Sequence, residues 1–336
     1  MDSHPFNPHN KPMKTTYLGL AIDSPVIVAS SPYTATLNNV ERCAANGAGA
    51  VVLKSVFEEQ IVRQAASLEY ATTYADADSY LQRYLGDDYI RCYLTLIEEA
   101  RNRTAIPVIA SINCISLGDE WVAYAKCMER SGASALELNI FLPPVDPQQQ
   151  AASIERNYLQ IVQCVAEAVS IPVSVKLPMR FTNLFNLAEG LLGRGARGAV
   201  LFNRYFEPDI DIEHLTLVAG DPYSQPAELR NVLRTTARCT AVVPQLEIAV
   251  SGGVHTGDAA VRSLLCGAQV VQLCTAIHNE GYEIIRRIGK FIDEWADRHN
   301  FCSVEEFRGR MNLRNITDPQ LYERVQYMKY YPDTPE

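Results

Sequence analysis

Eight short runs of apolar, mostly β-branched residues recur along the chain, and a segment with helical periodicity follows most of them. The runs are continuous instead of alternating, which is typical of strands buried on both faces, as in a parallel sheet. They lie at 26–31, 50–55, 107–113, 135–140, 172–178, 198–203, 247–253 and 269–275.

The repeated alternation of strand and helix predicts an α/β fold, an eight-stranded parallel (β/α)8 TIM barrel. The chain has 336 residues, and a plain barrel needs about 250, which leaves room for insertions. The alternative is a doubly wound sheet. Such a sheet usually opens with a glycine-rich phosphate turn after its first strand, and the sequence VASSPYTA at 28–35 contains no glycine.

Two segments flank the expected barrel of residues 14–312, and a third is inserted within it. Residues 1–13 are rich in Pro, Asn and His and lack the apolar core of a signal peptide, so we expect a disordered leader. Residues 57–90, after the second strand, are long enough to form an insertion or a lid. Residues 313–336 are rich in Tyr, and we expect a C-terminal helical tail that packs on the barrel or on another subunit.

Composition excludes several classes of protein. A net charge of −9 without a Lys/Arg cluster argues against a nucleic-acid surface. No apolar run approaches the ~20 residues that span a bilayer. The nine Cys are scattered with no C-x-x-C pair, which argues against a metal site or a disulfide framework and favours reduced thiols in a cytoplasmic protein.

Polar residues stand where the apolar runs end, and barrel enzymes place their chemistry at the carboxyl ends of the strands. Strands also end on polar residues simply because they end at the surface. A Lys inside an apolar run, as in VVLKS and VSVKLP, is costly to bury without a partner. The set therefore predicts a small-molecule site, and its members are Ser30, Lys54, Ser55, Asn113, Asn139, Lys176, Asn203, Ser251, Gly252, Gly253 and Thr275.

The sequence AVSGGVHTGDAA at 249–260 indicates an anion site. A strand ends there in Gly252 and Gly253, and a helix begins within a few residues, which exposes backbone N–H groups at a helix N-terminus. Barrels commonly bind phosphate after strands seven and eight. The backbone of Cys274 and Thr275, after the eighth strand, would form the other wall.

Lys176 permits two interpretations. It could form a Schiff base, as in barrel aldolases, or it could be a fixed cation beside a cofactor that becomes anionic, such as a reduced flavin. The neighbouring Asn residues favour the flavin, because aldolase sites usually need a carboxylate or Tyr as proton shuttle.

These motifs resemble those of the dihydroorotate dehydrogenases, FMN-dependent barrel enzymes, and most closely the soluble class 1 branch. The resemblance covers about residues 14–312. It is densest in SGGVHTGDAAVRSLLCGAQVVQLCTAIHNEG and FCSVEEFRGRMNL, and VLKS, VKLP and QPAELRNV match in order and spacing. It implies an FMN cofactor, oxidation of dihydroorotate to orotate in pyrimidine biosynthesis, and a cytoplasmic homodimer.

The resemblance also implies roles for single residues. Lys176 would lie near the N1/O2 edge of the flavin. Lys54, Asn139 and Asn203 would contact substrate as well as cofactor. The cofactor-binding set that it implies is Ala29, Ser30, Lys54, Ser55, Asn113, Asn139, Lys176, Asn203, Ser251, Gly252, Gly253, Cys274 and Thr275.

The chain departs from the family where the substrate should bind. The family's fourth strand ends Asn-x-Ser-(Cys or Ser)-Pro-Asn, in which the Cys or Ser is the catalytic base. Here Leu142 stands at the base position and Pro144 at the substrate Asn. A general base contributes typically ~10²–10⁴ in rate, and Leu cannot serve. Cys114, Asp146 and Tyr205 remain weak candidates.

Three further differences accompany the lost base. The family's Asn-x-x-Gly-x-x-Asn loop after strand two is absent from 57–90, Ser31 and Cys274 replace two glycines, and Arg204 adds a cation that could bind an anionic substrate. The hypotheses left open are an FMN oxidoreductase acting on dihydroorotate or a related cyclic anion, a flavin oxidoreductase with another substrate, and a non-catalytic flavin-binding protein.

Overall fold

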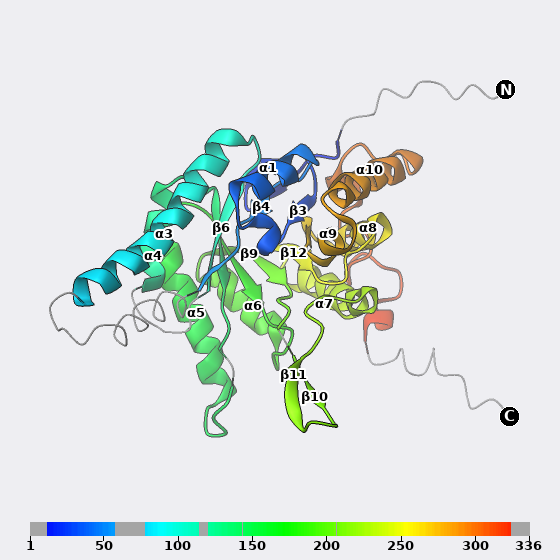
Figure 1. The fold of residues 1–336 in the computed structure, drawn as a ribbon. Helices are drawn as coiled ribbons and strands as arrows, with labels where there is room; N and C mark the ends of the chain where they lie inside the picture. Colours follow the sequence, from blue (N-terminus) through cyan, green and yellow to red (C-terminus); the bar gives the residue numbers. More distant parts are fainter. Residues whose placement is uncertain (1–11, 58–77, 114–119, 143, 206, 324–336) are drawn as a thin grey trace.

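Eight parallel strands form a closed barrel in the computed structural model, which describes residues 12–57, 78–113, 120–142, 144–205 and 207–323 (Figure 1). The strand order around the barrel is β4-β3-β13-β12-β9-β8-β7-β6, and β6 pairs with β4 to close it. The strands are β3 (Val26–Val28), β4 (Val51–Val52), β6 (Val108–Asn113), β7 (Ala135–Asn139), β8 (Val173–Leu177), β9 (Ala196–Leu201), β12 (Glu247–Ser251) and β13 (Val270–Leu273).

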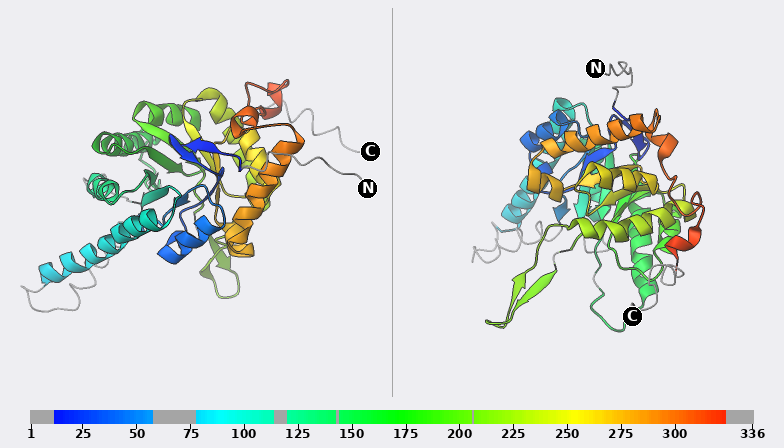
Figure 2. Two further views of the ribbon diagram at one scale, coloured as in Figure 1. Left: turned by 90° about the horizontal axis from the view of Figure 1, so that it is seen from above. Right: turned by 90° about the vertical axis from the view of Figure 1, so that its right-hand side faces the viewer.

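The first and last barrel strands are neighbours, with Val26 opposite Val271. All eight predicted runs are strands of this sheet, and the TIM-barrel prediction is confirmed. Helices surround the sheet on its outside, as the view from above in Figure 2 shows. They are α1 (Leu37–Ala45), α3 (Asp78–Arg103), α4 (Glu120–Arg130), α5 (Ala151–Ala168), α6 (Leu184–Gly193), α7 (Leu229–Val242), α8 (Gly257–Leu265), α9 (Thr275–Glu280), α10 (Glu283–Arg298) and α11 (Val304–Phe307).

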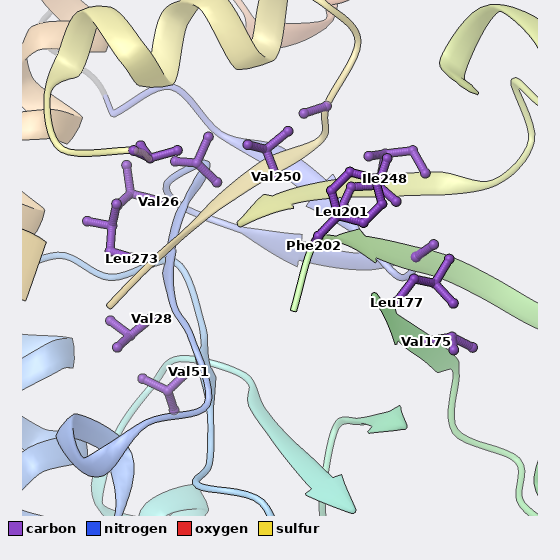
Figure 3. Packing of buried hydrophobic residues seen from close by; sticks show 14 of the residues in the cluster. Val26, Val28, Val51, Val175, Leu177, Leu201, Phe202, Ile248, Val250 and Leu273 are labelled. Atoms are coloured by element: carbon purple, nitrogen blue, oxygen red, sulfur yellow. The ribbon is translucent and has the colours of Figure 1, made fainter. Parts of the chain in front are cut away.

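Both faces of the sheet are buried, which explains why the strand sequences are continuously apolar. Successive side chains of a strand point to opposite faces. In β3, Ile27 belongs to one core cluster, while Val26 and Val28 belong to another that includes residues of the surrounding helices. Figure 3 shows part of the second cluster, including Val26, Val28 and Val250.

Two antiparallel hairpins accompany the barrel. In the first, β1 (Thr15–Tyr17) pairs with β2 (Leu20–Ile22), and Tyr17 and Leu18 are buried in the same cluster as Ile27. In the second, β10 (Pro208–Asp211) pairs with β11 (Thr216–Ala219) and projects away from the barrel (Figure 1). Neither hairpin was predicted from the sequence, because strands of three or four residues carry little periodic signal.

The predicted extra segments are partly described. A short strand, β5 (Val56–Phe57), pairs with β6, and residues 78–90 form the first half of helix α3; residues 58–77 lie outside the described part of the chain. At the carboxyl end, the 3-10 helix η3 (Pro319–Tyr322) packs on the barrel, since the Tyr322 hydroxyl donates to the Met311 carbonyl at 2.8 Å. Met13 is buried and its N–H donates to Asp293 Oδ1 at 2.9 Å. Residues 1–11 are not described, and the disordered leader stays a prediction.

We expect Val250→Ala to lower the free energy of unfolding by about 2 kcal/mol, because it deletes two methyl groups from a fully buried site. Val242→Ala is the matched control. Val242 is 52% exposed at the end of α7, and its truncation should stay within about 0.5 kcal/mol of the parent. Urea denaturation of both variants measures the difference. Equal changes in the free energy of unfolding of the two variants would contradict the placement of Val250 in the core between β12 and the helices.

Candidate active site

The residues that end the strands converge at one rim of the barrel. Ser55 Oγ lies 3.0 Å from Ser30 Oγ and 2.8 Å from Ser111 Oγ, which links the ends of β3, β4 and β6. On the far side, Asn203 Nδ2 donates to Asn139 Oδ1 at 2.7 Å. Parallel strands place their carboxyl ends at the same rim, and this explains why residues far apart in the sequence meet here.

Lys176 is buried on β8, and its partner is a carboxylate inside the barrel. Lys176 Nζ lies 3.8 Å from Glu137 Oε1, and Glu137 is 1% exposed. Gln272 Nε2 donates to Glu137 Oε2 at 2.7 Å from β13, on the opposite side of the barrel. The burial of Lys176 is thereby compensated. Glu137 and Gln272 were not singled out from the sequence, although an acidic residue inside the apolar run ALELNI carries the same signal as the buried Lys.

A cavity of about 160 Å³ opens at this rim, and we call it the strand-end cavity. Ser55, Asn113 and Asn139 are buried at their strand ends but do not line it, and Lys54 is exposed. Nine of the thirteen predicted cofactor residues do line it, namely Ala29, Ser30, Lys176, Asn203, Ser251, Gly252, Gly253, Cys274 and Thr275.

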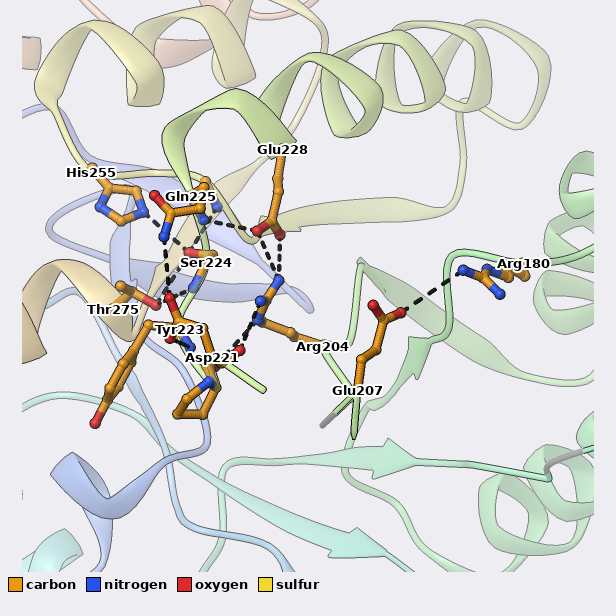
Figure 4. A network of polar contacts seen from close by, with 12 residues as sticks. Arg180, Arg204, Glu207, Asp221, Tyr223, Ser224, Gln225, Glu228, His255 and Thr275 are labelled. Atoms are coloured by element: carbon orange, nitrogen blue, oxygen red, sulfur yellow. Dashed lines mark hydrogen bonds and ion pairs between the residues drawn. The ribbon is translucent and has the colours of Figure 1, made fainter. Parts of the chain in front are cut away.

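Hydroxyl and N–H groups cluster at the end of this cavity where the anion site was predicted (Figure 4). Ser224 Oγ lies 3.1 Å from both Thr275 Oγ1 and His255 Nε2, and it accepts a hydrogen bond from the Gly253 N–H at 3.3 Å. The Ser224 N–H donates to Thr275 Oγ1 at 3.1 Å. Burial lowers the pKa of His255, which favours the neutral imidazole. Sequence reasoning missed Ser224, because it lies on a loop without a recognisable motif.

Arg204 lines the strand-end cavity, but its guanidinium is occupied by protein groups. Its Nη1 donates to both carboxylate oxygens of Glu228 at 2.8 Å. Its Nε and Nη2 donate to the carbonyls of Pro222 and Asp221 at 3.2 and 3.0 Å. Arg204 thus fastens the segment 221–225, which carries Ser224, to the end of β9 (Figure 4). The geometry does not leave Arg204 as the unpaired cation expected for an anionic substrate.

The loop after β7 carries apolar side chains at and beside the position where the family has its catalytic base. Leu142 is half-buried and packs against the core, and Phe141 stacks on Tyr205 with ring centroids 3.9 Å apart. Asp146 is exposed and accepts a hydrogen bond from the Gln148 N–H at 2.8 Å, which fixes a turn. Cys114 lies outside the described residues.

Tyr205 is the remaining candidate. Its hydroxyl is buried near the Asn203 side chain and makes no hydrogen bond of good geometry with the described residues. Burial raises the pKa of Tyr205, so the hydroxyl keeps its proton at neutral pH.

A second cavity, of about 820 Å³, lies beside the first, and we call it the loop cavity. It is bounded by the loops after β7, β8 and β9 and by the start of α7. The two cavities adjoin, because five residues line both: Phe202, Asn203, Arg204, Ser251 and Gly252.

A buried cation, a cluster of hydroxyl and N–H groups and an adjoining cavity at the carboxyl rim are typical of a barrel enzyme with a strand-end active site. No group of acidic, His and Cys side chains that could hold a metal ion occurs among the described residues. Over the same residues, none of the helices is both long and apolar enough to cross a membrane.

The chain belongs to the dihydroorotate dehydrogenase family, whose sequence profile matches residues 12–295. It is 27% identical over 314 residues to dihydroorotate dehydrogenase A (fumarate) of Lactococcus lactis subsp. lactis, covering 89% of this chain and 99% of that protein. The dihydroorotate dehydrogenases (fumarate) of Lachancea kluyveri and Saccharomyces cerevisiae are 25% and 24% identical, over 88% and 89% of this chain and 97% and 98% of theirs. The family resemblance is confirmed, and the chain is a dihydroorotate dehydrogenase-like oxidoreductase.

We expect Arg204→Leu to loosen the segment 221–228, because it removes the hydrogen bonds that fasten this segment to β9. Loss of charged hydrogen bonds of about 1.5 kcal/mol should speed amide exchange of the segment about tenfold through local opening. Arg180→Leu is the control, since Arg180 is exposed and lies 3.8 Å from the exposed Glu207. Hydrogen–deuterium exchange of both variants measures the effect, and unchanged exchange in Arg204→Leu would contradict the role given to Arg204.

Proposed function

We propose that the protein is an FMN-dependent oxidoreductase whose substrate differs from dihydroorotate. The observation that carries the cofactor half is the strand-end cavity, in which a buried Lys176 and the Ser224, Thr275 and Gly253 donors line one space. A cation at one end and an anion site at the other suit a ring that becomes negative on reduction and a phosphate. The cavity of about 160 Å³ holds only part of FMN, so the rest would extend into the adjoining loop cavity.

Two further features of the cavity fit FMN. Gly252 has φ +94°, and a Cβ added there would meet no atom within 4 Å. The backbone of Gly252 therefore borders open space that a ligand can fill. Gln272 Oε1 is buried without a hydrogen-bond partner among the described residues. FMN would supply hydride transfer, Lys176 would favour its reduced anionic form, and Ser224, Gly253 and Thr275 would hold its phosphate.

The substrate half of the proposal rests on the loop after β7. Leu142 occupies the family's base position and Pro144 that of a substrate Asn, and the Phe141–Tyr205 stack lies next to them. Dihydroorotate would therefore meet neither a base at the family position nor the expected amide. One alternative is its oxidation with a base from elsewhere, which stopped-flow kinetics can test, and the other is a non-catalytic flavin-binding role.

We also propose a cytoplasmic homodimer. All cysteines that the described residues include are free thiols, in keeping with a reducing compartment. On the β10–β11 hairpin, Ile210, Leu215 and Leu217 are 64, 85 and 74% exposed. An apolar surface of this kind is typical of a contact with another chain, and a second copy is the simplest partner.

Gly252→Ala should lower the FMN content of the purified protein severalfold, because the added Cβ projects into the strand-end cavity. Gly47→Ala is the matched control. Gly47 also has a positive φ, +82°, and a Cβ added there would meet no atom within 4 Å, so this change carries a similar backbone strain of about 1 kcal/mol away from the cavity. Absorbance of the released flavin measures the content. Full FMN content in Gly252→Ala would contradict the cavity assignment.

Anaerobic dihydroorotate should reduce the flavin of the unmodified protein slowly or not at all. Leu142→Cys should recover little of the reduction rate. Pro144 still leaves a polar group of dihydroorotate without its Asn partner, and such an unpaired group costs ~1–3 kcal/mol in binding. The triple replacement Phe141→Ser, Leu142→Cys, Pro144→Asn should reduce faster than the single one. Stopped-flow measurement of flavin bleaching tests these expectations. Rapid bleaching of the flavin in the unmodified protein would show that another residue serves as base.

A further inference from the structure

The loop cavity defines the class of substrate, an inference that rests on the proposed flavin-dependent function. We propose that this cavity binds a neutral, largely apolar ring compound that is larger than a single pyrimidine ring. Three properties of the cavity support this ligand class: its size, its lining and its charge balance.

The size of the loop cavity exceeds the needs of a small metabolite. Its volume of about 820 Å³ lies in the upper part of the ~300–1,000 Å³ range in which proteins bind drug-sized ligands. The cavity also adjoins the strand-end cavity along the wall formed by Asn203 and Gly252. One end of a ligand in the loop cavity would therefore face the cofactor site, while the rest extends outward between the loops.

The lining of the loop cavity is dominated by aromatic and aliphatic side chains from four elements of the chain. Phe141 and Leu142 come from the loop after β7, Met179 and Phe181 from the loop after β8, Ile154 from α5 and Val232 from α7. Burial of apolar ligand surface contributes about 25 cal/mol per Å². A polar cyclic amide such as dihydroorotate would gain little from such a wall.

The charges that line the loop cavity do not favour an anion. Arg204 is paired with Glu228, and Arg180 lies 3.8 Å from Glu207 (Figure 4). Glu155 adds a third carboxylate. Two guanidinium groups against three carboxylates give a net charge of −1 along the described lining. A carboxylate ligand would have to break the Arg204–Glu228 pair or lie near these acids.

Tyr205 contributes its ring to the wall of the loop cavity, where it stacks on Phe141.

Calorimetric titration of the holoprotein with two probes of equal ring size tests this inference. The neutral ketone 2-acetylnaphthalene should bind at least about tenfold more tightly than the anion 2-naphthoate, and dihydroorotate should bind no better than the anion.

A variant tests the charge balance. Glu228→Gln leaves the Arg204 charge uncompensated, so 2-naphthoate should gain several-fold in affinity while the ketone changes little. Binding of naphthoate or dihydroorotate to the unmodified protein as tight as that of the ketone would overturn the inference, as would unchanged naphthoate binding in Glu228→Gln.

The flavin absorbance of the same samples separates this inference from the proposed function. Flavin present without ketone binding would overturn the inference about the loop cavity alone. Ketone binding without flavin would support the ligand class and overturn the FMN-dependent function.

Discussion

The buried pair of Lys176 and Glu137 is the interaction on which the site depends. A cation deep in a barrel must be paired, and breaking such a pair costs about 3–5 kcal/mol. Glu137 pairs with Lys176 from the neighbouring strand, and Gln272 holds Glu137 from across the barrel. The strand register that closes the barrel therefore also places a fixed positive charge at the rim, where a cofactor ring would lie.

Around this fixed cation the molecule divides into two halves. On the side of β12 and β13, Ser224, Thr275 and Gly253 converge, and Arg204 and Glu228 fasten the segment that supplies Ser224. On the side of β7 and β8, Leu142 and Pro144 stand at the positions of the family's base and of one substrate Asn, while Asn139 is kept. The proposed function assigns the first half to the cofactor of the family and the second to a different substrate. A kept cofactor half and a changed substrate half are consistent with the general rule that loops on a stable barrel determine function.

Much of the fold could be predicted because the signals were local. Strands buried on both faces leave continuous apolar runs, and Gly252 and Gly253 before a helix indicate an anion site. The roles that depend on side-chain contacts could not be predicted. Arg204 looked like a free cation, because its partner Glu228 lies on another element. Ser224 and Gln272 lie beside or within segments that match the family, but the sequence does not reveal their contacts with Thr275 and Glu137. The β10–β11 hairpin is too short for periodicity to reveal. Such features arise from tertiary packing, which one sequence does not display.

In the proposed function, this chain keeps the residues of its family's cofactor half and has lost the base and one amide of the substrate half, at Leu142 and Pro144. The most direct test is the visible absorbance spectrum of the purified protein, titrated with orotate. We predict about one bound FMN per chain and no change of the flavin bands on adding orotate, because Pro144 removes one substrate amide and apolar side chains line the space beside the cofactor site. A colourless protein, or a saturable shift of the flavin bands at micromolar orotate, would contradict this conclusion.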